Sequence, residues 1–215
     1  MRISELRASL LLVTLAATLA ASITACDRVD NLVAPSGSAP ATSEAAQSPS
    51  MPGIPWAGNP TLAQGLAALR DATDQFHDAA VALAAGYRPS AAGCESSATG
   101  AMGIHYGHPA LLGIVRGSSP VTGTDAVIDP LRPEVLMYEP QDDGGRRLVG
   151  VEFVVYRAAW DALHQQPPAF FGTPFDRKFG AEAHGHADHY ELHVWLWRHN
   201  PLGMFEPWNP KVSCV

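Results

Sequence analysis

The chain has little lysine and no basic run. Of its 215 residues, 14 are Lys or Arg and 21 are Asp or Glu, which gives a net charge of −7. The only lysines are Lys178 and Lys211. Proteins that bind nucleic acid neutralise phosphates with clustered basic side chains, and proteins held on anionic lipid by charge need a polybasic segment. The composition therefore excludes both modes of binding.

Common signatures of nucleophilic and nucleotide chemistry are also missing. The sequence contains neither the G-x-S-x-G of a serine nucleophile elbow nor a phosphate-binding glycine loop. Close C-x-x-C spacing, which is typical of zinc thiolate sites, is absent as well. The sequence thus names no reaction, no catalytic residue and no substrate.

The first 26 residues contain the most specific pattern in the chain. A charged start with Arg2 and Arg7 is followed by an apolar run over 10–22, too short for a membrane-spanning helix, and then by Ile-Thr-Ala-Cys at 23–26. This order resembles the lipobox of a bacterial lipoprotein precursor. The resemblance implies that residues 1–25 are a signal peptide and that Cys26 carries a diacylglycerol anchor. An ordinary signal peptide is the alternative.

This resemblance sets the expected location and the division of the chain. We expect an extracytoplasmic protein, periplasmic or at the cell surface, attached to a membrane of the cell envelope through its lipid. Residues 26–60 are rich in Ser, Ala, Pro and Thr, so they are expected to form a flexible tether rather than a packed core. Residues 61–215 have the length of one globular domain.

The two remaining cysteines, Cys94 and Cys214, are predicted to form a disulfide. An isolated cysteine pair in an exported protein is usually oxidised. The alternative, a pair of metal thiolates, lacks the usual close spacing.

The hydrophobic pattern predicts an α+β domain. Leu62, Leu66, Leu69, Phe76, Ala80 and Leu83 recur at helical spacing, which predicts one long helix over 62–85 with a capping box at Thr61 and Gln64. Apolar runs predict strands at 102–106, 134–139, 148–156 and 190–197. We expect the helix to pack on a curved, cone-like antiparallel sheet, with an open ferredoxin-like sheet as the alternative.

Three ionisable residues interrupt these apolar strands: His105, Glu152 and His193. A charged or titratable group inside an otherwise apolar strand is out of place unless it has a partner or a function. If the three side chains share one face, they form a two-histidine, one-carboxylate set that suits zinc, copper or iron. An acid–base pair without metal, or hydrogen-bonded core residues, would use the same positions.

A second histidine group lies just before the last strand. His184, His186 and His189 make a weaker metal-site candidate, because a histidine-rich loop often faces solvent. Three function classes follow from these patterns: a lipoprotein that binds a metal or small ligand, a metal-dependent enzyme that uses His105, Glu152 and His193, or a structural lipoprotein that binds a protein partner.

Overall fold

The computed structural model describes residues 61–170 and 172–214. The predicted signal peptide, Cys26 and the tether therefore lie outside the described residues. Among the residues that are described, no helix is long and apolar enough to cross a membrane.

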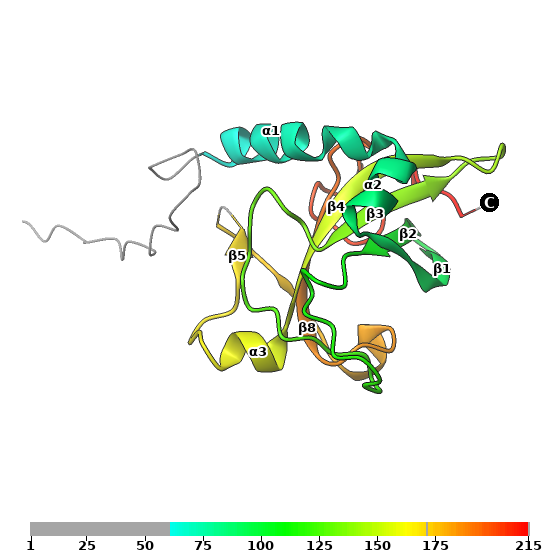
Figure 1. Cartoon of the computed structure of the whole chain (residues 1–215). Coiled ribbons are helices and arrows are strands. Elements are labelled where there is room, and N and C mark those ends of the chain that lie inside the picture. Colours follow the sequence, from blue (N-terminus) through cyan, green and yellow to red (C-terminus); the bar gives the residue numbers. More distant parts are fainter. Residues whose placement is uncertain (1–60, 171, 215) are drawn as a thin grey trace, which may run out of the picture. The chain divides into compact units, whose positions relative to one another are not determined.

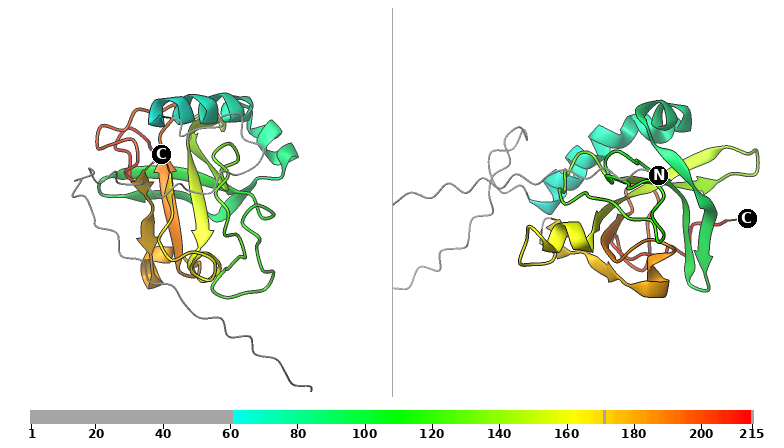
Figure 2. Two further views of the ribbon diagram at one scale, coloured as in Figure 1. Left: turned by 90° about the vertical axis from the view of Figure 1, so that its left-hand side faces the viewer. Right: turned by 60° about the horizontal axis from the view of Figure 1, so that its bottom comes forward.

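A curled antiparallel sheet with helices on one face makes an α+β fold (Figures 1 and 2). Its six strands are ordered β1-β2-β3-β4-β8-β7, and every neighbouring pair is antiparallel. Their bounds are β1 Arg88–Ser97, β2 Gly100–Gly107, β3 Val135–Pro140, β4 Arg146–Tyr156, β7 Asp176–Lys178 and β8 His189–Val194. The short strands β5 (Ala169–Phe170) and β6 (Thr173–Pro174) form a separate pair. The predicted curved antiparallel sheet is confirmed, and the open ferredoxin-like alternative is not observed.

The prediction of one long helix was wrong, because the segment breaks in its middle. It forms α1 (Leu62–Thr73), a 3-10 turn η1 (Asp74–His77) and α2 (Ala79–Ala85). Asp78 starts α2 as its N-cap by accepting a hydrogen bond from the Ala80 amide, and this competes with a continuous helix. The break rotates the apolar stripe, so that Ala82 is buried and the expected Leu83 is exposed.

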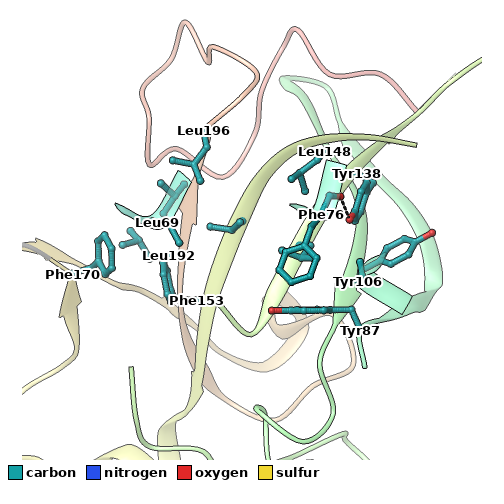
Figure 3. Packing of buried hydrophobic residues seen from close by; sticks show 14 of the residues in the cluster. Leu69, Phe76, Tyr87, Tyr106, Tyr138, Leu148, Phe153, Phe170, Leu192 and Leu196 are labelled. Atoms are coloured by element: carbon teal, nitrogen blue, oxygen red, sulfur yellow. Dashed lines mark hydrogen bonds between the residues drawn. The ribbon is translucent and has the colours of Figure 1, made fainter. Parts of the chain in front are cut away.

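Two sides of the sheet have different chemistry. One side packs its apolar residues against α1, η1 and α2, as Leu69, Phe76, Phe153 and Leu192 show (Figure 3). The Tyr138 hydroxyl donates to the Phe76 carbonyl at 2.6 Å, which ties β3 to the helical layer (Figure 3). Because side chains alternate along a strand, the residues between these apolar positions face the opposite, concave side.

The structure contains a β-hairpin and the predicted disulfide. Strands β3 and β4 pair through a turn in which the Gly144 amide donates to the Gln141 carbonyl. Cys94 on β1 is bonded to Cys214 in the C-terminal tail, with a sequence separation of 120 residues. A loop of that length corresponds to a stabilisation of about 5 kcal/mol in the chain-entropy model.

Some elements of the structure were not predicted from the sequence. Strand β1 was not expected, because its sequence of small residues, Gly and Pro has low strand propensity. Two short helices were also not expected, α3 (Arg157–Asp161) and the 3-10 turn η2 (Gly180–Ala183).

We predict that Glu134 makes the fold less stable as the pH rises. Glu134 is buried and accepts a hydrogen bond from the Val154 amide at 3.0 Å, and burial raises its pKa to about 8. Between the unfolded value of 4.5 and this folded value, the folded protein holds the extra proton. The free energy of unfolding should therefore fall by about 4 kcal/mol between pH 5 and pH 8 through this group.

Urea denaturation at a series of pH values tests this prediction. Glu134→Gln should remove most of that decline, whereas Glu182→Gln, at an exposed position, should leave it unchanged. Equal slopes in the wild type and in Glu134→Gln would show that Glu134 ionises normally in the folded protein.

Candidate metal centre

His105, Glu152 and His193 meet on the concave side of the sheet. One ligand atom from each residue lies within 4.8 Å of the other two. The His105 Nε2 is 3.6 Å from the Glu152 Oε2, and the His193 Nε2 is 3.8 Å from the Glu152 Oε1. Among the described residues this is the one group of three or more His, Cys, Asp or Glu side chains with such geometry.

Strand pairing explains part of this convergence, and sheet curvature explains the rest. Glu152 on β4 is the direct cross-strand partner of His193 on β8, so their side chains share a face. His105 lies on β2, with the whole of β3 between it and β4. In a flat sheet two strands so arranged would be about 9.5 Å apart. The curl of the sheet brings the His105 and Glu152 side chains into contact across β3.

A glycine next to this group leaves no room for a side chain. A Cβ added at Gly150 would lie 2.6 Å from the Val194 carbonyl oxygen and 2.7 Å from the Met137 Cε. Gly150 pairs with Met137, the residue opposite His105 on β3. The small residue thus lets β3, β4 and β8 approach closely beside the three candidate ligands.

His193 is an unusual buried histidine. Its side chain is 1% exposed, and neither of its ring nitrogens has a hydrogen-bond partner. Burial lowers its pKa to about 4, so the imidazole is neutral near pH 7 and each nitrogen that lacks a proton has a free lone pair. Buried polar groups without partners are rare in folded proteins and need an explanation, and an absent ligand is one.

A carboxylate lies behind each of the two histidines. The His105 Nδ1 is 3.2 Å from the Glu95 Oε1, and the His193 Nδ1 is 3.7 Å from the Glu191 Oε1. Neither contact has hydrogen-bond geometry in this structure, but the second nitrogen of a histidine ligand commonly donates to an acceptor in this position, which fixes the tautomer and makes the first nitrogen a better ligand. The sequence analysis did not identify Glu95, because nothing marked β1 as a strand.

The pKa values of Glu152 and Glu191 are shifted in opposite directions. Burial raises the pKa of Glu152 well above its usual value, and the neighbouring Glu191 adds to this rise. Burial alone would also raise the pKa of Glu191, but the hydrogen bond from His189 and the positive charge of Lys178 outweigh it. The pKa of Glu191 is therefore held well below its usual range. Glu152 therefore holds a proton more tightly than Glu191 does.

The weaker candidate group, His184, His186 and His189, lies close to the same place but each member has its own partner. The His184 Nδ1 is 3.3 Å from the Glu95 Oε2, and the His186 Nδ1 is 3.0 Å from the Tyr156 hydroxyl. These residues do not form a ligand set with one another in the described part of the chain.

His189 has both ring nitrogens engaged. Its Nδ1 is 2.9 Å from the Ala187 carbonyl and its Nε2 is 3.2 Å from the Glu191 carboxylate. The Ala187 carbonyl and the Glu191 carboxylate are both hydrogen-bond acceptors, so each ring nitrogen of His189 faces an acceptor. Together with Lys178, whose Nζ lies 3.2 Å from the Glu191 Oε1, it holds Glu191 in place.

A cavity of about 230 Å³ opens beside the three candidate ligands. Its charged and histidine lining residues are Arg88, Glu95, His105, Glu152, His184, His186, His189 and Glu191. Its apolar lining residues include Met102, Pro109, Leu112, Val135 and Val154. His193 is buried and is not part of the lining. A metal held by the three residues would thus be reached by small molecules from the side of His105 and Glu152.

Comparison with known proteins adds no family to this description. No protein-family model matches the chain, and neither the curated proteins nor the solved structures include a significant match.

We predict that His193 and His189 respond in opposite ways to replacement by leucine in metal-free protein. His193→Leu removes two unpaired buried nitrogens and should leave the free energy of unfolding unchanged or raise it by about 1–3 kcal/mol. His189→Leu removes two hydrogen bonds and should lower it by about 1–3 kcal/mol. The two residues lie on the same strand and are similarly buried, so each is the matched control for the other.

Urea denaturation in the presence of EDTA measures both effects. If His193→Leu destabilises the protein as much as His189→Leu does, then His193 is an ordinary structural histidine.

Proposed function

We propose that this protein is a lipid-anchored, extracytoplasmic protein that binds one divalent transition-metal ion through His105, Glu152 and His193. The observation that carries the proposal is the buried His193 imidazole, which has no hydrogen-bond partner and lies beside Glu152. Two imidazoles and one carboxylate are ligands that zinc, copper and iron accept.

The distances fit a single ion after small side-chain movements. With bonds of about 2.0–2.2 Å, neighbouring ligands of a tetrahedral ion lie about 3.3–3.6 Å apart. The observed 3.6 and 3.8 Å, which go to different oxygens of Glu152, are close to these values, and one atom from each residue lies within 4.8 Å of the others. The outer carboxylates Glu95 and Glu191 lie where the hydrogen-bond acceptors of such sites usually lie.

A metal-dependent enzyme is the second candidate, and the adjoining cavity supports it. Three protein ligands leave further coordination positions open, as in catalytic rather than structural zinc sites. The cavity borders His105 and Glu152, so a bound small molecule could reach the ion directly.

Metal analysis of purified protein tests the main proposal. Protein purified without a histidine tag should take up about one equivalent of zinc, cobalt or copper after dialysis, measured by inductively coupled plasma mass spectrometry. His193→Ala and Glu152→Gln should lose this uptake because each removes one ligand. Glu95→Gln should weaken binding by roughly 10–100-fold because it removes support from His105.

His199→Ala is the control, because His199 is exposed and lies near the end of the same strand. It should bind the metal like the wild type. Equal metal content in His193→Ala and His199→Ala would contradict the proposed site.

The lipid anchor is tested separately, in bacteria that express the full chain. Cys26→Ser should leave the precursor unprocessed and remove the mature protein from the membrane fraction, because no thiol remains to receive the lipid. Immunoblots of membrane and soluble fractions measure the change, with His199→Ala as a control that should fractionate normally. Unchanged processing and membrane association of Cys26→Ser would contradict the lipidation.

A further inference from the structure

We propose that the Cys94–Cys214 disulfide is a redox switch for the metal site, so that the protein binds its ion more tightly when this bond is formed. The inference rests on the metal site proposed above, and it adds how that site is regulated. A dithiol reductant would transfer two electrons and two protons to the bond, leave two cysteine thiols and itself become a disulfide. Metal binding would then weaken.

Glu95 connects the disulfide to the candidate ligands. It directly follows Cys94 in β1, and its carboxylate lies between two histidines. The Glu95 Oε1 is 3.2 Å from the His105 Nδ1, and its Oε2 is 3.3 Å from the His184 Nδ1. A carboxylate behind a histidine ligand orients the imidazole and commonly contributes roughly 10–100-fold to metal affinity. The position of Glu95 therefore affects how well His105 can hold the ion.

The pairing of β1 with β2 holds Glu95 only weakly. Register shifts in this pairing occur just before Cys94 and just after Glu95, so these two residues lie between two irregularities of the ladder. The residue opposite Glu95 on β2 is Gly103, which has no side chain that could contact the carboxylate. The segment that carries Glu95 therefore depends on a further attachment to keep its position.

The disulfide attaches this segment to a firmly held part of the C-terminal tail. Val212 is buried in an apolar cluster that includes Trp195, and Cys214 packs against that cluster. The Ser213 amide donates a hydrogen bond to the Glu139 carboxylate at 3.0 Å. The Val212 and Ser213 contacts do not involve the disulfide, so opening the bond releases β1 while the tail keeps its own anchors.

A reductant can reach this bond from solvent. Cys94 and Cys214 are both partly exposed, whereas the ligand His193 is buried. Disulfides form in oxidising compartments and are reduced in the cytosol. The chain would therefore gain its full metal affinity only after export, which couples metal binding to the extracytoplasmic location proposed above.

Zinc affinity of disulfide variants tests the switch, measured by competition with a chelating dye in thiol-free buffer. Cys94→Ala/Cys214→Ala removes the bond without leaving thiols that could bind zinc themselves. It should bind zinc about tenfold or more weakly, as Glu95→Gln does, because both changes take the carboxylate from His105. Adding Glu95→Gln to the double variant should cause little further loss, because changes that act through one contact are not additive.

Leu69→Ala is the control for a general loss of stability. Leu69 is buried in the apolar layer under the helices, so its replacement weakens the core but leaves β1 and the disulfide in place. It should bind zinc like the wild type. Sucrose in every sample favours the folded state, and near-UV circular dichroism shows whether each variant is folded.

Reduction of the wild-type protein gives a second measurement that needs no cysteine variant. The metal-free protein is reduced with a phosphine, its thiols are capped with iodoacetamide, and the reagents are removed before zinc is added. The reduced and capped protein should keep its near-UV signal and bind zinc about tenfold or more weakly than a sample treated without phosphine. Loss of the near-UV signal together with zinc binding would show that the bond holds the whole fold, and would overturn the switch.

The results separate this inference from the metal site itself. If the wild type binds zinc and the double variant and the reduced protein bind it equally tightly, the switch is wrong and the metal site stands. A similar loss of affinity in Leu69→Ala, or a much larger loss in the triple variant than in Glu95→Gln, would show that the disulfide does not act through Glu95. If the wild type does not bind zinc, the metal site and the switch both fail.

Discussion

The register of β4 against β8 is the constraint on which the rest of the site depends. It places Glu152 opposite His193 and, in the same pairing, Phe153 opposite Leu192. Because side chains alternate, a slip of one residue would move this polar pair, Glu152 and His193, into the apolar layer beneath the helices. The apolar face of this strand pair therefore fixes the position of the polar pair. The core and the site are specified by the same hydrogen-bonding pattern.

A second constraint holds the edge of the sheet near the site. Strand β1 has small residues and two irregularities in its pairing with β2, so its own packing is weak. The Cys94–Cys214 disulfide ties it to the C-terminal tail, one residue before Glu95. Glu95 is the carboxylate behind His105. The disulfide thus supports the outer part of the site as well as the stability of the chain.

The sequence was sufficient to predict the three central residues because they break an apolar pattern. His105, Glu152 and His193 each stand inside a hydrophobic strand, and the period of two told which neighbours share their face. The curl that brings His105 to Glu152 across β3 could not be predicted, because it depends on how whole strands bend together. Glu95 was missed because it lies in a strand of small residues that gives no periodic signal. The break in the first helix was missed because the local cap at Asp78 competes with a good apolar stripe.

The three polar residues of β8 differ in how fully their side chains are hydrogen-bonded. His189, Glu191 and His193 alternate with Tyr190, Leu192 and Val194, which pack in the apolar core. His189 uses both nitrogens to hold Glu191, and Lys178 adds a second contact to the same carboxylate. His193 lies at the other end, beside Glu152, and has no hydrogen bond of its own. Buried polar groups that serve only stability are normally satisfied within the protein, as His189 is. These two histidines lie four residues apart on one strand, and only His189 has hydrogen-bond partners. This contrast is the physical reason to propose that His193 binds a metal ion and that His189 holds Glu191 in position.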